Sequence, residues 1–391
     1  MKSFDVIVAG LGAMGSAAAH QLASRGARVL GLEQYTEAHD RGSSHGGSRI
    51  IRATLYKEAA YVRLLRRAAE LWRQLERDSG ASLLTVTGGL AMGRPDHSVI
   101  DGGLRSAREF GLAHELLDPY ELRRRFPPFA PAPDMVGVYE PGAGFLDPEG
   151  SIRAFLRQAA RRGVELRFNE PVLRWEALPS GDRVRVVTPA GAYEASRLVI
   201  TPGAWARAAA SRLGLPLAIA RVVMFWFDPV GGTTPFLPDR FPIYVCIPNG
   251  GERFYGFPAH HGPTGGAKVA FSLVMTPATL DGVDREVHPP EIAQMREHLA
   301  QCLPALAGPC VAAKTCLYTN TPDLNFVIGQ HPAAAQCYVA AGFSGHGFKF
   351  ASVVGEILAD LATSGGTRHD IALFAPTRFS GAAAPGAVPY V

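Results

Sequence analysis

The sequence has little cysteine, little net charge and no long apolar run. Its 391 residues include 5 cysteines without a C-x-x-C pair, which argues against a disulfide framework and a structural zinc site. A net charge of +4 is too small on this length to indicate a nucleic-acid partner. Without about 18 consecutive apolar residues, no transmembrane helix is expected. A first strand beginning at Phe4 leaves no room for a signal peptide. We therefore expect a cytoplasmic monomer with reduced thiols and no metal site.

The stretch from Phe4 to Ser16, FDVIVAGLGAMGS, carries the strongest motif. An apolar run predicts a strand, and an alanine-rich segment after it predicts a helix. Between them lie three glycines with the spacing G-x-G-x-x-G: Gly10, Gly12 and Gly15. The first permits a tight turn, the second lets the backbone approach a pyrophosphate, and the third lets helix and strand pack closely. A second apolar strand ends in Glu33, whose carboxylate suits a ribose 2′-hydroxyl. The stretch predicts a dinucleotide site at a helix N-terminus, with a plain glycine-rich turn as the alternative.

Later segments return to this site. An apolar strand from Arg197 to Thr201 ends in a small-residue turn. A strand from Tyr338 to Ala341 then leads into a glycine loop and a helix, and this loop contains Gly342, Gly345 and Gly347. Residues 217–273 alternate in the pattern of a mostly antiparallel sheet.

These patterns predict an α/β protein with two domains. A discontinuous Rossmann-type FAD-binding domain is expected over residues 1–85, 145–205 and 325–378. A substrate domain with a mostly antiparallel β-sheet is expected over 86–144 and 206–324, and residues 379–391 are expected to be a flexible tail. The site would lie where the two domains meet.

The residues alone do not separate NAD from FAD. The late glycine loop favours FAD, because a larger cofactor needs more contacts. The irregular, His- and Arg-rich loop over residues 34–52, which shows no helical or strand period, favours it too.

Five motifs in this order identify a resemblance: FDVIVAGLGAMGS, HGGSRIIR (45–52), YGFP (255–258), CLYTNTPD (316–323) and AAGFSGHGFKF (340–350). The sequence resembles the monomeric sarcosine oxidase and N-methyltryptophan oxidase family of flavin amine oxidases over nearly its whole length. The resemblance implies FAD, a two-domain fold, and oxidation of a secondary amine by O₂ to an imine and H₂O₂. The imine then hydrolyses.

The resemblance also implies residue roles. Cys316, which by itself reads as a core thiol, would be linked covalently to the flavin. Arg52 and Lys349, each otherwise a surface cation, would bind the substrate carboxylate. Lys268 would activate O₂ beside the flavin, although a solvent-facing strand lysine is the alternative. The remaining expected site residues are His45 and Arg49 beside the flavin ring, Tyr255 and Tyr318 lining the substrate site, and Ser44 and Val172 binding the cofactor.

Three positions depart from the sarcosine oxidase pattern. Ser272 replaces a histidine, and Leu55 and Lys57 replace a tyrosine and a glutamate. We therefore expect Ser272 to border a substrate pocket that accepts a bulkier or differently charged amine than sarcosine.

The sequence thus predicts a flavin-dependent oxidase of an N-methyl or cyclic amino acid that bears a carboxylate. The main alternative is a dehydrogenase of the same fold that passes electrons to a carrier other than O₂. An NAD(P)-dependent reductase and a non-catalytic nucleotide-binding protein are weaker alternatives.

Overall fold

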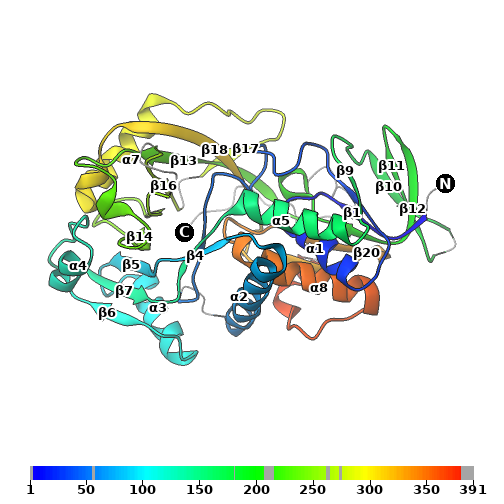
Figure 1. Cartoon of the computed structure of the whole chain (residues 1–391), viewed down its shortest axis with the longest axis horizontal. Helices are drawn as coiled ribbons and strands as arrows, with labels where there is room; N and C mark the ends of the chain where they lie inside the picture. Colours follow the sequence, from blue (N-terminus) through cyan, green and yellow to red (C-terminus); the bar gives the residue numbers. More distant parts are fainter. Residues whose placement is uncertain are drawn as a thin grey trace.

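A computed structural model describes residues 3–54, 58–179, 181–206, 215–260, 265–272 and 275–379. Leu55, Lys57 and the expected tail beyond Phe379 lie outside these ranges. The described strands form two large sheets and one small sheet, arranged along the length of the molecule (Figure 1). In these ranges no helix has the length and apolar content needed to cross a membrane.

The first sheet contains a parallel core. In spatial order its strands are β20 (Ala334–Ala341), β12 (Gly191–Ile200), β1 (Ser3–Ala9), β2 (Val29–Leu32) and β9 (Glu165–Arg167). Three antiparallel strands extend it: β19 (Val327–His331) beside β20, and β10 (Arg174–Ala177) and β11 (Val184–Thr188) beside the start of β12. Ala9 lies opposite both Ile200 and Leu32, so three parallel strands end together. Ligands of open α/β sheets bind at such carboxyl ends.

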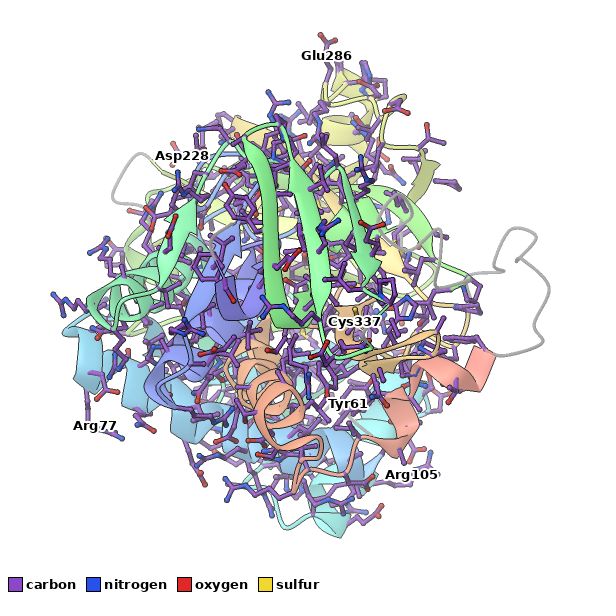
Figure 2. The ribbon with its side chains drawn as sticks, turned by 90° about the vertical axis from the view of Figure 1, so that its right-hand side faces the viewer. Tyr61, Arg77, Arg105, Asp228, Glu286 and Cys337 are labelled. Carbon is purple, nitrogen blue, oxygen red and sulfur yellow. The ribbon has the colours of Figure 1, made fainter. Side chains whose placement is uncertain are left out.

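Helices cover one face of this sheet. They are α1 (Ala13–Ser24), α2 (Ala59–Ser79), α5 (Pro148–Arg161) and α8 (Ala351–Ser364). Val6 and Val8 of β1 pack into the same apolar core as these helices, whereas Ile7 packs with Trp175 and Val186 of β10 and β11. The alternation follows from the two-residue period of a strand. Figure 2 shows this end of the molecule face on, with the hairpin strands in front and α8 below them.

The second sheet is mostly antiparallel, as predicted. Its order is β17 (Thr276–Ala278), β13 (Ala218–Phe227), β16 (Ala267–Phe271), β15 (Phe254–Gly256), β14 (Ile243–Cys246), β5 (Gly89–Gly93), β7 (Val136–Glu140) and β6 (Glu115–Leu117). Strands β17 and β16 pair with successive parts of one edge of β13, and the long strand β18 (Cys310–Asn320) pairs with its opposite edge. Among these pairings β14 with β5 is parallel. Helices α3 (Ser98–Glu109), α4 (Pro119–Arg125) and α7 (Pro289–Cys302) accompany this sheet.

A three-stranded sheet joins the two halves. It consists of β3 (Arg49–Ile51), β8 (Gly144–Leu146) and β4 (Leu84–Val86). The sequence predicted an irregular loop over residues 34–52, and this prediction was wrong for Arg49–Ile51. These residues form a strand because they pair with β8. Short 3₁₀ helices complete the described chain: η1 (Gly203–Trp205), η2 (Thr234–Phe236), η3 (Pro304–Leu306), η4 (Phe348–Phe350), η5 (Ala372–Phe374) and η6 (Pro376–Phe379). The predicted α/β fold class is confirmed, and the exact domain bounds stay a prediction.

Candidate active site

A cavity of about 770 Å³ lies between the carboxyl ends of the first sheet and one face of the second. Most of the predicted site residues line it: Gly10, Gly12, Glu33, Ser44, Arg49, Arg52, Val172, Tyr255, Ser272, Cys316, Tyr318, Gly342, Gly345, Gly347 and Lys349. Gly15, His45 and Lys268 do not appear in its lining. The structure thus brings together residues from five distant parts of the chain.

The glycine turn at the start of α1 has two kinds of glycine. A Cβ on Gly15 would lie 1.8 Å from the carbonyl oxygen of Gly10, so the packing of helix on turn requires glycine there. Gly10 has a φ of +92°, which also favours glycine. By contrast, a Cβ on Gly12 would meet nothing nearer than the Ser44 Oγ at 4.0 Å. The protein itself does not demand glycine at position 12, which is the position that a pyrophosphate would approach.

The Glu33 side chain is held beside this glycine turn by hydrogen bonds to the backbone. Its buried carboxylate accepts hydrogen bonds from the backbone N–H of Leu11 at 2.8 Å and of Tyr35 at 3.1 Å. The Glu33 side chain is therefore held at the carboxyl end of β2, where it lines the cavity. Its predicted bond to a ribose stays a prediction.

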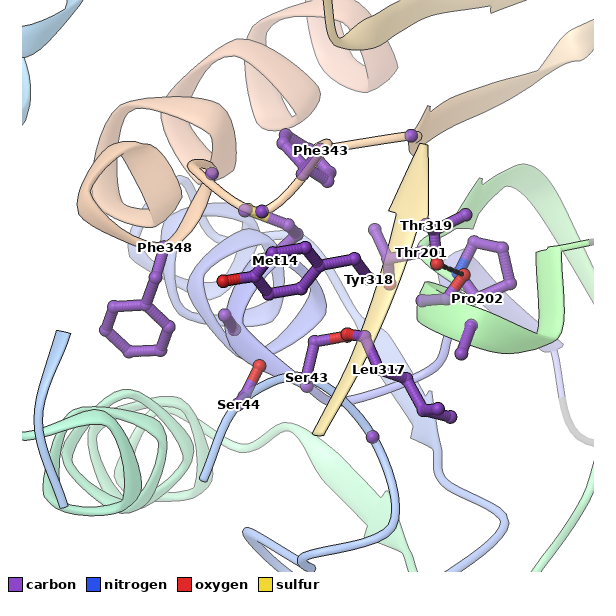
Figure 3. Close-up of a pocket in the computed structure, with 18 of the residues that line it drawn as sticks. Met14, Ser43, Ser44, Thr201, Pro202, Leu317, Tyr318, Thr319, Phe343 and Phe348 are labelled. Atoms are coloured by element: carbon purple, nitrogen blue, oxygen red, sulfur yellow. Dashed lines mark hydrogen bonds between the residues drawn. The ribbon is translucent and has the colours of Figure 1, made fainter. Parts of the chain in front are cut away.

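The two later returns of the chain border the same cavity. Thr201, directly after β12, donates a hydrogen bond from its Oγ1 to the carbonyl of Gly10 at 2.7 Å. The C-terminal glycine loop packs on β18, where the Ser344 N–H bonds the Thr319 carbonyl at 2.9 Å. Figure 3 shows Met14, Thr201, Tyr318, Phe343 and Phe348 around the resulting pocket.

Cys316 faces the cavity from β18, beside Arg49. The Arg49 guanidinium is anchored by the carbonyls of Ser43 and Ser48, each at 2.8 Å, and its Nη2 lies 3.7 Å from the Cys316 Sγ. Burial raises the pKa of the Cys316 thiol, while Arg49 and then Lys268 act to lower it. The thiol is thus buried next to a fixed positive charge, within reach of a ligand in the cavity.

Lys268 is buried, so the alternative of a solvent-facing lysine is wrong. Its Nζ donates hydrogen bonds to the carbonyls of Gly46 at 2.9 Å and Ser48 at 2.6 Å. The same loop is also held from α5, where the Glu149 carboxylate accepts hydrogen bonds from the N–H groups of Gly46 at 2.6 Å and Gly47 at 3.1 Å. Burial, and then Arg49, lower the pKa of Lys268 well below its ordinary value. Lys268 therefore supports the loop that carries His45 and Arg49.

His45 has unsatisfied ring nitrogens. It is buried, and neither Nδ1 nor Nε2 has a hydrogen-bond partner among the described residues. Burial, and then Arg49, lower the pKa of His45 to about 4, so its imidazole is neutral near pH 7. Because buried polar atoms are normally bonded, a further group is needed beside this ring. That need, together with the open space over Gly12, fits a bound dinucleotide.

Arg52 and Lys349 come together in the wall of the cavity. Both are buried and both line the cavity, Arg52 directly after β3 and Lys349 in η4. Burial, and then Arg52, lower the pKa of Lys349 to about 7. Arginine and lysine are the side-chain types that bind carboxylates and other anions.

Two further cavity residues were missed from the sequence. Arg253 and Asn320 also line the cavity, and the Asn320 Oδ1 is buried without a partner among the described residues. Strand parity could have indicated both, because Arg253 precedes Tyr255 by two residues and Asn320 follows Tyr318 by two.

Comparison with known families decides the class of the protein. A sequence profile described as "DAO: FAD dependent oxidoreductase" matches residues 5–361. The chain belongs to this family of FAD-dependent oxidoreductases. The expected enzyme class, the FAD cofactor and the fold class are thereby confirmed. The roles of individual residues stay predictions.

Relatives within the family confirm the resemblance. A protein named monomeric sarcosine oxidase from Streptomyces avermitilis is 51% identical over 386 residues, which cover 98% of this chain and 99% of the relative. A monomeric sarcosine oxidase from Bacillus sp. strain B-0618 is 35% identical, with 96% of each chain covered. The N-methyl-L-tryptophan oxidase of Salmonella heidelberg is 32% identical, with 96% of this chain and 99% of the relative covered.

Two solved structures share the fold of this chain. NikD, described as an unusual amino acid oxidase essential for nikkomycin biosynthesis, superposes with a TM-score of 0.84 at 27% identity, covering 96% of this chain and 98% of its own. An L-proline dehydrogenase from P. horikoshii superposes with a TM-score of 0.85 at 24% identity, covering 97% and 98% of the two chains. The latter likeness concerns the fold alone.

Proposed function

We propose that this FAD-dependent oxidoreductase oxidises a secondary amino acid, N-methylated or cyclic, to an imine, with O₂ as acceptor and H₂O₂ as product. The observation that carries the proposal is the pair of buried cations, Arg52 and Lys349, in the cavity that also holds the nucleotide turn and Cys316. The relatives named sarcosine oxidase and N-methyl-L-tryptophan oxidase support the same substrate class.

Arg52 and Lys349 bind the carboxylate of the substrate. The Arg52 guanidinium offers a planar fork and the Lys349 ammonium a point charge. Their positive charge has a second effect, because it disfavours the ammonium form of the substrate amine and lowers the pKa of that amine. The neutral amine, which has a free electron pair, is the form that can be oxidised.

The FAD would be held along the cavity. Gly10 and Gly12 lie at its pyrophosphate end, Glu33 at its ribose, and the remaining contacts come from Ser44, Val172, Gly342, Gly345 and Gly347. When bound, FAD accepts two electrons from the substrate and passes them to O₂. We propose Cys316 as the point of covalent attachment, because its thiol is the cavity-lining nucleophile beside Arg49.

His45 and Arg49 belong to the segment over residues 44–49, and Lys268 supports this segment. The Arg49 charge, fixed by two carbonyls, stabilises negative charge that develops in the cavity. The neutral His45 ring can donate one hydrogen bond and accept another. Lys268 supplies a cation for O₂ activation and holds the carbonyls of Gly46 and Ser48 in place.

Three assays test the proposal. In an anaerobic titration, sarcosine or a larger N-methyl amino acid should bleach the flavin, and admission of air should yield H₂O₂. Bleaching without peroxide would favour the dehydrogenase alternative. After acid precipitation, a yellow pellet supports attachment at Cys316, and a colourless pellet contradicts it.

The monomeric state and the cytoplasmic location remain part of the same proposal. Sedimentation and cell fractionation test them. The proposed domain bounds, with breaks near residues 85, 145, 205 and 325, are tested by limited proteolysis.

A further inference from the structure

Arg253 is a cation of the cavity wall that has no part in the proposed reaction. Arg253 directly precedes β15 and lines the cavity. Its carbonyl accepts a hydrogen bond from the N–H of Ser272 at 2.8 Å, so the two residues lie opposite each other, directly before β15 and directly after β16. Two residues further along the same ladder, Tyr255 lies opposite Ala270. Residues opposite each other, and residues two apart on a strand, share a face, so Arg253 and Ser272 project on the side of Tyr255, toward the cavity.

The Arg253 side chain has no partner among the residues that the structure describes. No described residue forms a hydrogen bond or an ion pair with it, and its Nε is buried and unsatisfied. Burial alone lowers the pKa of its guanidinium, without a contribution from a neighbouring charge. A partly buried guanidinium normally has an acidic or carbonyl partner, because leaving it unpaired costs free energy. An anion in the cavity would supply that partner.

Arg253 is separate from the carboxylate-binding pair. The charge of Arg52 acts on Lys349, and these two residues lie directly after β3 and in η4, whereas Arg253 lies directly before β15 of the second sheet. The cavity residues near Arg253 in the sheet are uncharged: Ser272 opposite it and Tyr255 beside it. The cavity therefore has a second positive site on its other wall, and the small side chain of Ser272 leaves room in front of it.

We propose that Arg253 binds a second anionic group of the substrate, a carboxylate on its side chain, so that the preferred substrates are N-substituted dicarboxylic amino acids. The inference rests on the proposed function for the position of the first carboxylate. The guanidinium of Arg253 donates a two-pronged hydrogen bond to the side-chain carboxylate, and this specificity does not require Arg253 to touch the reacting carbon or nitrogen.

Binding of unreactive analogues tests the inference without turnover. In the flavin-loaded enzyme, perturbation of the flavin spectrum reports the dissociation constants of two thioethers of similar size, the dianion 2-(methylthio)succinate and the monoanion 2-(methylthio)butanoate. We expect the dianion to bind at least about 10-fold more tightly than the monoanion. Arg253→Met should weaken binding of the dianion about 10- to 100-fold and leave the monoanion within about twofold. Arg253→Lys should retain part of the selectivity.

The matched control is Arg240→Met. Arg240 is an exposed arginine in the same half of the molecule, and its Nε lies 3.7 Å from an Asp239 carboxylate oxygen. It should change neither constant. Equal binding of the two thioethers, or equal weakening of both by Arg253→Met with the melting temperature preserved, would overturn the inference. If N-methyl amino acids fail to bleach the flavin but the dianion selectivity depends on Arg253, the proposed function fails and the anion site stands. If N-methyl amino acids with uncharged side chains are oxidised and Arg253→Met changes neither dissociation constant, the proposed function stands and the inference fails.

Discussion

The two glycines of the nucleotide turn should respond differently to the same small change. Gly15→Ala places a methyl group 1.8 Å from the Gly10 carbonyl oxygen and 2.5 Å from the Thr201 Oγ1, so α1 must move away from the turn. Gly12→Ala meets only the Ser44 Oγ, at 4.0 Å. The backbone at Gly12, with φ −66° and ψ −160°, is open to alanine. Its methyl group would instead occupy the space in which a pyrophosphate must lie.

The magnitudes follow from this geometry. Overpacking costs about 1–3 kcal/mol or more, and we expect the upper end for Gly15→Ala because the clash is with backbone. With an unfolding entropy of about 2.1 cal/mol/K per residue, 3 kcal/mol corresponds to a fall of about 4 °C in Tm for this chain. Gly12→Ala should change the free energy of unfolding of the apoprotein by less than about 0.5 kcal/mol. Loss of a charged hydrogen bond to phosphate should still weaken FAD binding about 10- to 100-fold.

The assay uses Cys316→Ser as the parent, so that FAD can be removed and titrated back. Thermal melts of the apoproteins measure stability, and quenching of flavin fluorescence measures affinity. Unchanged FAD affinity in Gly12→Ala, or equal destabilisation of both apoproteins, would refute this division of roles between the two glycines.

Three further results are expected. Lys268→Met removes one of the two hydrogen bonds that each of the Gly46 and Ser48 carbonyls accepts, at a cost of about 1–3 kcal/mol. The change should slow reoxidation by O₂ more than anaerobic reduction, and equal slowing of both would contradict the O₂ role. Because the pKa of Lys349 is lowered to about 7, its ammonium is present below that pH, and affinity for a carboxylate inhibitor should fall as pH rises through about 7; this inflection should be missing in Lys349→Met. Burial acts to raise the pKa of Glu356, but the hydrogen bonds from His369 and Arg67 have the larger effect and lower this pKa from 4.5 to about 2. The ionised Glu356 carboxylate therefore adds about 2–3 kcal/mol to the free energy of unfolding above pH 4.5, and this contribution is lost as the pH falls toward 2. Acid unfolding of Glu356→Gln with the same pH dependence as wild type would contradict this prediction.

The parts of the fold that follow local rules were predictable. The strand, glycine turn and helix at Gly10 to Gly15 were readable from spacing, and the antiparallel second sheet from alternation. The strand at Arg49–Ile51 was not, because its pairing with β8 joins residues almost 100 positions apart. Propensity in a short polar loop does not contain that information.

The site was predictable where a motif fixed it. Arg52, Cys316 and Lys349 were found by resemblance, and the structure adds that they line one cavity. Arg253 was missed because no motif marks it. Strand parity with Tyr255 could have placed it on the cavity face, but that it has no partner among the described residues is visible only in the three-dimensional packing. The clamp that Lys268 forms on the loop at Gly46 was equally invisible, because hydrogen bonds to backbone carbonyls leave no trace in side-chain patterns.

The central claim is that buried cations select an amino acid and that this enzyme then oxidises its secondary amine. The most direct measurement is the anaerobic rate of flavin bleaching by an N-methyl amino acid, compared with the same amine lacking the carboxylate, in wild type and in Lys349→Met. We predict that the acid bleaches wild-type flavin at least about 100-fold faster than the amine at equal low concentration, and that Lys349→Met removes most of this advantage. Equal rates for the acid and the amine in wild type, or bleaching by neither, would contradict the account.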